Sequence, residues 1–98
     1  MTDLPRPAIT FTYCTQCNWM LRTAWMAQEL LQSFGQDIAS VTLVPGTGGI
    51  FRIEADGALL WDRKDRGGFP DSRQLKQMIR DHAWPDRTLG HTDRTKSD

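Results

Sequence analysis

Residues 8–17 read A-I-T-F-T-Y-C-T-Q-C, a short run of β-branched and aromatic residues that ends in two cysteines separated by two residues. Residues 8–13 have the composition of a β-strand. A helical stretch follows over about residues 18–34, and Gly35 is placed to end it. The sequence therefore predicts a strand, a C-x-x-C motif and a helix in direct succession.

The apolar residues of this helix recur at steps of three and four, which places them on one helical face. They are Met20, Ala24, Ala27, Leu31 and Phe34. We expect that face to be buried. Leu21 and Trp25 lie well round from it, so the pattern predicts a large aromatic side chain near the surface.

Three more strands follow the helix. The first is Ile38–Val44, which we expect Pro45 and the glycines after it to end. The next two cover residues 50–55 and 58–62, and Asp56-Gly57 between them is a strong signal for a two-residue hairpin turn. The run 63–68 then reads as a charged, flexible link.

A last helix is predicted over about residues 71–84, with Pro85 to stop it. Its apolar stripe is Leu75, Met78, Ile79 and His82. His82 is therefore interpreted as a packed core histidine. Residues 86–98 are polar, and we expect a mobile tail there with Leu89 as an anchor.

The resulting order is β-α-β-β-β-α. A strand, a crossover helix and a second strand form a right-handed parallel unit, to which an antiparallel hairpin can be added. This predicts an α/β fold (α+β, two layers) of the thioredoxin-like type, with a four-stranded mixed sheet in a domain of residues 1–85. In so small a sheet the strand Ile38–Val44 is expected at an edge.

The 98 residues suffice for one domain, and its twelve basic residues balance its twelve acidic ones. Such a balance gives no reason to expect nucleic acid or a membrane surface as partner. The N-terminal residues lack the apolar run of a signal peptide, and no run approaches the length of a membrane span. We therefore expect a cytoplasmic protein, in which a C-x-x-C pair indicates redox or metal chemistry rather than a structural disulfide.

Cys14 and Cys17 are the candidate catalytic residues. The start of a helix offers unpaired N–H groups and a positive dipole end, both of which stabilise a thiolate. One cysteine then attacks a disulfide and the other resolves the mixed disulfide. Two inert buried cysteines are a weaker interpretation, because the residues between and after them are polar. A zinc site would need two further ligands, for which only His82 and His91 are available, so neither metal nor cofactor is expected.

Several motifs together resemble the selenoprotein W-like proteins of bacteria, within the selenoprotein T, W and H family of thioredoxin-like proteins. They are Tyr13-Cys14-x-x-Cys17-x-Trp19, Glu29-Leu30, Pro45-Gly46-x-Gly48-Gly49-x-Phe51, Trp61-Asp62-Arg63-Lys64 and Gly68-Phe69-Pro70. The resemblance implies thiol redox chemistry, with glutathione as a candidate reductant. In thioredoxin-like enzymes generally the first cysteine attacks, which would be Cys14. The resemblance to this family instead matches Cys17 to the selenocysteine position, which narrowly favours Cys17 as the attacking residue.

Two functions are consistent with these residues. The first is a thiol–disulfide oxidoreductase or antioxidant linked to glutathione or thioredoxin. The second is a redox-sensitive module that binds a protein partner on Trp19 and residues 46–49 without turnover. The basic residues of the link 63–68 could meet an anionic substrate, although a solvated loop is the favoured interpretation. A homodimer through Trp25 or the edge strand is also compatible with the sequence.

Overall fold

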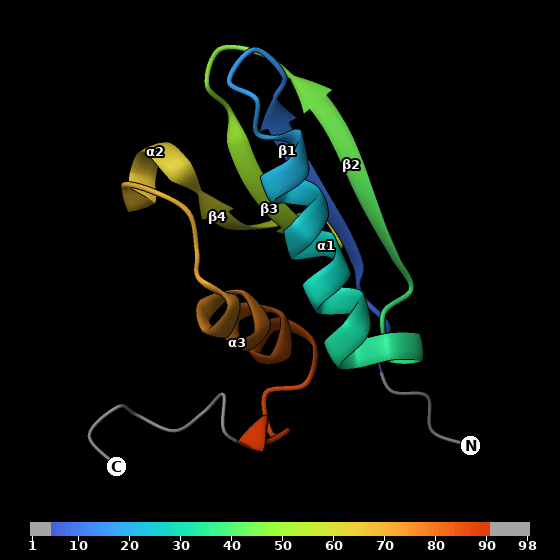
Figure 1. The fold of residues 1–98 in the computed structure, drawn as a ribbon. Coiled ribbons are helices and arrows are strands. Elements are labelled where there is room, and N and C mark those ends of the chain that lie inside the picture. The colour runs from blue at the N-terminus through green and yellow to red at the C-terminus, as the bar shows by residue number, and fades with distance from the viewer. Residues whose placement is uncertain (1–4, 91–98) are drawn as a thin grey trace.

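The computed structural model describes residues 5–90 (Figure 1). Its strands are β1 (Ala8–Cys14), β2 (Ser40–Gly46), β3 (Phe51–Ala55) and β4 (Ala58–Asp62). Its helices are α1 (Met20–Phe34), α2 (Arg63–Arg66) and α3 (Ser72–Ala83), with a 3-10 turn η1 (Gly35–Asp37) after α1. The predicted α+β class and four-stranded mixed sheet are confirmed. No helix among residues 5–90 is long and apolar enough to cross a membrane.

The strands lie in the order β2-β1-β3-β4, with β1 parallel to β2 and antiparallel to β3. The predicted edge position of β2 is therefore confirmed. Its predicted end at Pro45 is wrong, because β2 continues through Pro45 and pairs Gly46 with Cys14. An edge strand tolerates proline, since one side of the strand needs no N–H donor.

Helices α1 and α3 cover one face of the sheet (Figure 1). The side chains of Ile9, Phe11 and Ile53 point into this layer and are completely buried. The two helices are also joined directly, because Glu29 on α1 accepts a hydrogen bond of 3.0 Å from Ser72 at the start of α3. The core therefore lies between one sheet face and two helices.

The predicted buried face of α1 is only partly correct. Ala27 and Phe34 are buried, but Met20 is 46% exposed and Leu31 is 45% exposed. The buried residues of the helix are Thr23, Met26, Ala27, Leu30 and Phe34. Thr23 can be buried because its hydroxyl donates to the Trp19 carbonyl at 2.8 Å, and a count of apolar residues overlooks such a position. Leu21 and Trp25 are exposed, as predicted.

The hairpin is confirmed and the flexible link is not. Asp56 and Gly57 have φ of 53° and 83°, as a tight two-residue hairpin turn requires. The link instead begins with the short helix α2. Asp62 caps this helix by accepting a hydrogen bond of 2.9 Å from the Lys64 backbone N–H, and Gly67 ends it with φ 75°.

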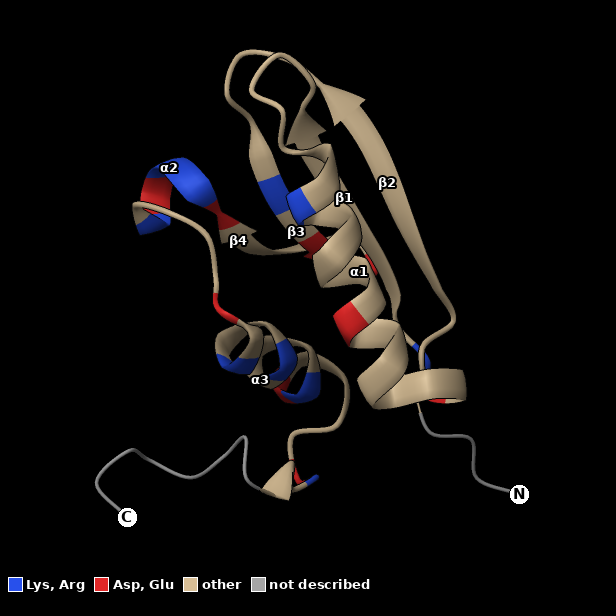
Figure 2. Cartoon of the chain, in the orientation of Figure 1, with Lys and Arg blue, Asp and Glu red and all other residues tan. Residues whose placement is uncertain are grey.

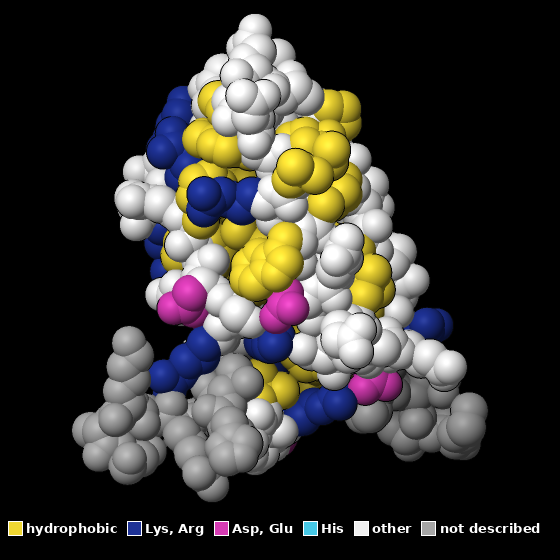
Figure 3. Space-filling model, viewed as in Figure 1, with side chains coloured by type: hydrophobic (Ala, Val, Ile, Leu, Met, Phe, Trp, Pro, Cys, Tyr) yellow, Lys and Arg dark blue, Asp and Glu magenta, His cyan; other side chains and the backbone are white. Residues whose placement is uncertain are grey.

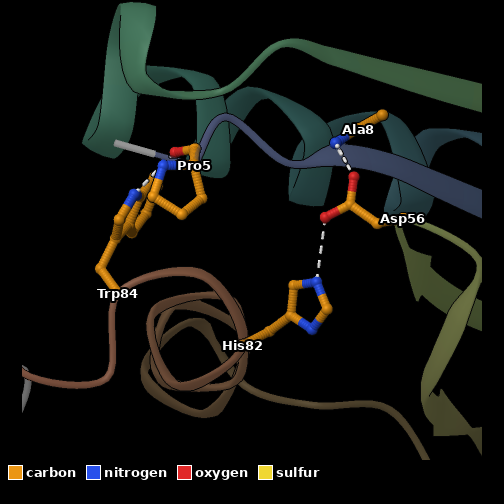
Figure 4. Close-up of polar contacts among 5 residues, drawn as sticks. All are labelled: Pro5, Ala8, Asp56, His82 and Trp84. Carbon is orange, nitrogen blue, oxygen red and sulfur yellow. Dashed lines mark hydrogen bonds and ion pairs between the residues drawn. The ribbon is translucent and has the colours of Figure 1, made fainter. Parts of the chain in front are cut away.

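The end of the sheet opposite the cysteines is closed by polar contacts (Figure 4). Asp56 Oδ1 accepts a hydrogen bond of 3.0 Å from the Ala8 backbone N–H. His82 is not a core residue as predicted: it is only partly buried and lies 3.0 Å from the other Asp56 oxygen. Trp84 donates its indole N–H to the Pro5 carbonyl at 2.8 Å.

The first residues of the predicted tail are in contact with the domain. Leu89 packs against the core, as predicted. Arg87 forms an ion pair of 2.9 Å with Asp37 and stacks over the Trp84 ring. The rest of the predicted tail, residues 91–98, lies outside the described part of the chain.

Candidate functional site

The two cysteines lie at one end of the sheet, where β1 passes into the loop that leads to α1 (top of Figure 1). Cys14 is the last residue of β1, and Cys17 belongs to the turn that follows. The predicted strand-to-helix setting is confirmed. The expected stabilisation of a thiolate by the start of the helix does not apply, because α1 begins only at Met20. The N–H groups near the sulfurs therefore come from loops and not from the helix.

The cysteine turn is fixed to the end of β2. Both the backbone N–H and the hydroxyl of Thr15 donate to the Gly46 carbonyl, at 3.0 and 3.1 Å. The turn closes with a hydrogen bond of 3.3 Å from Asn18 N–H to the Thr15 carbonyl. Asn18 takes the left-handed conformation, φ 60°, which asparagine tolerates better than most residues. These contacts bring Cys17 back toward Cys14.

The two sulfur atoms lie 2.6 Å apart, with the Cys17 thiol donating to Cys14. Both cysteines are free. A disulfide bond has a length of about 2.05 Å, so oxidation of the two thiols to a disulfide requires only a small movement of the sulfur atoms. The two thiols differ in access: Cys14 is completely buried, whereas Cys17 is only partly buried.

The surroundings move the two pKa values in opposite directions. The hydrogen bond from Cys17 lowers the pKa of Cys14 most, and the backbone N–H groups of Gly49, Cys17 and Gln16 add to this against the effect of burial. The same hydrogen bond, burial and the Cys14 charge raise the pKa of Cys17, while Gly49 N–H and the Arg63 charge oppose that rise. When the pair loses its first proton, the negative charge is therefore favoured on the buried Cys14 sulfur.

Arg63 is the residue of this site that sequence reasoning underrated. It was expected in a solvated link, yet it begins α2 and is half-buried. Its guanidinium carbon lies 4.8 Å from the centre of the Trp19 ring, and Trp19 packs edge-on against Phe69 at 5.0 Å. Figure 2 shows α2 as a short segment of mixed charge beside the sheet. A four-residue helix is too short for periodicity to reveal, so Asp62 as a cap was its only clear signal.

The described residues offer no obvious metal site beside the thiols. Among residues 5–90, no group of three or more histidine, cysteine, aspartate or glutamate side chains is arranged to hold a metal ion. His82 pairs with Asp56 at the opposite end of β1. His91 lies outside the described residues.

Residues 8–81 match the sequence model of the Rdx family, which covers the sheet, the cysteine pair and nearly all of α3. The chain belongs to the Rdx family. Among solved structures, this Rdx-family chain is similar to a protein from Bordetella parapertussis, with 62% sequence identity and a TM-score of 0.77. The match covers 79% of this chain and 98% of the Bordetella chain.

The Rdx-family chain is also similar to a selenoprotein W-related protein from Vibrio cholerae, with 51% identity and a TM-score of 0.77 over 79% of this chain and 96% of the other. The resemblance inferred from the sequence motifs is therefore confirmed. No curated protein sequence matches the chain. The Rdx family is generally associated with redox chemistry, which agrees with the chemical character of the cysteine pair.

Proposed function

We propose that this chain is a thiol–disulfide oxidoreductase on a thioredoxin-like scaffold, and that it cycles Cys14 and Cys17 between dithiol and disulfide. The observation that carries this proposal is the 2.6 Å separation of a buried and a partly exposed sulfur. A thiol that attacks a substrate must be reachable, and a thiol that resolves the product needs only to reach its neighbour. Exposure therefore supports Cys17 as the attacking residue and Cys14 as the resolving residue.

In the proposed reaction the Cys17 thiol passes its proton along the hydrogen bond to the Cys14 sulfur, and the Cys17 thiolate so formed attacks a substrate disulfide, R–S–S–R′. The Cys17–S–S–R bond forms, the R–S–S–R′ bond breaks, and R′S⁻ leaves with the electron pair. The leaving R′S⁻ takes up the proton from Cys14, and the Cys14 thiolate then attacks the Cys17 sulfur, which forms the Cys14–Cys17 disulfide and releases RS⁻. The protein has lost two electrons and the substrate has gained them.

The cycle closes when two glutathione thiols, or one dithiol of the thioredoxin type, reduce the protein disulfide. This scheme requires no metal or bound cofactor, because the sulfur atoms themselves carry the electrons. Because a reducing thiol pool is the co-reactant, the proposal places the protein in a cytoplasm-like compartment.

The test is to oxidise the protein mildly and to measure its intact mass and peptide masses. We expect a loss of two hydrogens located on the peptide that holds Cys14 and Cys17. Repeated reduction of a small disulfide with glutathione and glutathione reductase then measures turnover. If no such disulfide forms and both thiols resist alkylation in the folded protein, the proposal fails.

The exposed apolar residues beside the site favour a second candidate, a redox-sensitive binding module. Met20, Leu21 and Trp25 are 46%, 75% and 45% exposed at the start of α1, directly after the cysteine turn. Figure 3 shows hydrophobic side chains, with basic ones among them, gathered on the face that carries α1. A protein partner could bind there in one redox state only. Stoichiometric oxidation without sustained turnover in the glutathione assay supports this candidate over the enzyme.

A further inference from the structure

The Arg63 guanidinium lies close to Trp19 and Gly49, two residues of the loops around the cysteine pair, and we call the space between these three residues the slot. Its carbon stands 4.8 Å from the centre of the Trp19 ring, two residues after Cys17. Its Nη2 atom lies 3.7 Å from the position that a Cβ atom would take at Gly49. The Gly49 backbone N–H also lowers the pKa of both thiols. The cation therefore lies near two residues of the loops around the thiols, and its charge acts on Cys17.

Further contacts hold the residues on either side of the slot in place. Asp62, the residue before Arg63, caps α2 and forms an ion pair of 2.9 Å with Arg52 on β3. Trp19 is supported by the edge contact with Phe69. Within residues 5–90 the buried Nε of Arg63 has no hydrogen-bond partner.

We infer that Arg63 is a positioning residue for the redox reaction, which places a fixed positive charge beside the Cys17 sulfur and stabilises its thiolate during attack. The inference rests on the proposed function for the identity of the reaction. Its geometry suits arginine in particular, because a flat guanidinium stacks on an indole ring and stays charged at every relevant pH. A cation close to a thiolate stabilises the charged form of the thiol.

The other charged groups around the pair do not supply this charge in the same way. Arg22 on α1 stacks over Phe69, with its guanidinium carbon 4.5 Å from the centre of that ring. Asp62 is occupied by Arg52. Lys64, the residue after Arg63, is exposed. Lys64 therefore provides a matched control, since it carries the same charge on the same helix outside the slot.

The experiment compares Arg63→Gln with Lys64→Gln, each in a Cys14→Ser background so that only Cys17 reacts. The rate of iodoacetamide alkylation is measured against pH on the folded protein. We expect Arg63→Gln to move the midpoint of the profile to higher pH and to slow alkylation near neutral pH by about threefold or more. Lys64→Gln should leave the profile in place. Equal profiles for the two variants would overturn the inference.

A second variant guards against loss of folding. Arg63→Lys keeps the charge but loses the planar stack, and we expect a midpoint between those of the parent and Arg63→Gln. Circular dichroism establishes that each variant is folded; if Arg63→Gln is not, Arg63→Met removes the charge in its place, and an unshifted midpoint in that variant counts against the inference. These alkylation profiles do not depend on turnover. If Arg63→Gln shifts the alkylation profile but the parent chain, with both cysteines, forms no Cys14–Cys17 disulfide on oxidation, the effect of Arg63 on the Cys17 thiolate is supported and the proposed function is refuted.

Discussion

His82 Nε2 lies 3.0 Å from Asp56 Oδ2, and this contact joins the last helix to the hairpin between β3 and β4. The hydrogen bond from the Ala8 backbone N–H, followed by the bond to His82, lowers the pKa of Asp56. A carboxyl group whose pKa is lowered by folding stabilises the protein above its unfolded pKa. That stabilisation is lost as pH falls through the lower, folded value.

We therefore expect Asp56→Asn to reduce the free energy of unfolding at pH 6 and to have progressively less effect below about pH 4, where the unfolded carboxyl protonates. Because the Asp56 side chain is 49% exposed, the loss at pH 6 should stay below about 1 kcal/mol. Asparagine is suitable here since it tolerates the positive φ of this position. Urea unfolding at several pH values measures the effect. A penalty independent of pH would contradict this account.

The neighbours Leu30 and Leu31 give a direct test of which face of α1 is buried. Leu30 is completely buried and Leu31 is 45% exposed. Leu30→Ala should cost about 2–5 kcal/mol of unfolding free energy, because it leaves a cavity in the core. Leu31→Ala makes the same chemical change and should cost about 0.5 kcal/mol or less. Denaturant unfolding of both variants decides; equal losses would favour the face expected from the sequence.

The attacking cysteine can be identified by trapping. In Cys14→Ser the partly exposed Cys17 remains, and we expect it to form a stable mixed disulfide with an aromatic disulfide reagent because nothing resolves it. In Cys17→Ser the buried Cys14 should react at least tenfold more slowly in the folded protein, an order-of-magnitude expectation from its lack of access. Intact mass spectrometry follows both reactions. The opposite order of reactivity would assign the attack to Cys14.

The coupling of the two thiols predicts how each titrates alone. The bond to Cys14 is the largest cause of the raised pKa of Cys17, so Cys14→Ala should lower that pKa. The same bond is the largest cause of the lowered pKa of Cys14, so Cys17→Ala should raise it. Ultraviolet absorbance of the thiolate against pH measures both variants. Two values that do not move would show that the thiols are not hydrogen-bonded in solution.

Gly46 connects β2 to the cysteine turn. A Cβ atom there would meet Ile50 Cγ2 at 2.8 Å, too close for a contact to persist. We expect Gly46→Ala to cost about 1–3 kcal/mol and to change the rate of Cys17 alkylation, because the Gly46 carbonyl holds Thr15. Removing the clash with Ile50→Ala in the same chain should recover part of the alkylation rate.

Gly57 provides the control for this variant, since it lies at the opposite end of the sheet with φ 83° and open space around it. Gly57→Ala should lower stability through backbone strain and leave the alkylation rate unchanged. If both glycine variants alter alkylation equally, the effect comes from general destabilisation and not from the contact with the cysteine turn.

Local patterns in the sequence were enough to predict the element order and the cysteine site. The β-branched run before Cys14 and the signal at Asp56-Gly57 describe conformations that short segments prefer by themselves. The position of Cys14 and Cys17 between a strand and a helix follows from the same local preferences. The motifs around them carried the resemblance to the family that the comparisons then confirmed.

What the tertiary structure alone decided depends on contacts between distant segments. Leu30 and not Leu31 lies on the buried face of α1, because the sheet and α3 determine which side is covered. His82 lies outside the core because Asp56, 26 residues earlier, accepts its hydrogen bond. The burial of Cys14, the exposure of Cys17 and the stacking of Arg63 on Trp19 likewise arise where β2 and α2 meet the cysteine turn. The sequence by itself determined that a C-x-x-C pair begins at the end of the first strand, since strand preference is local. Which sulfur is accessible, and which cation lies beside it, was decided by packing across the sheet, because burial and electrostatic fields are set by neighbours in space and not along the chain.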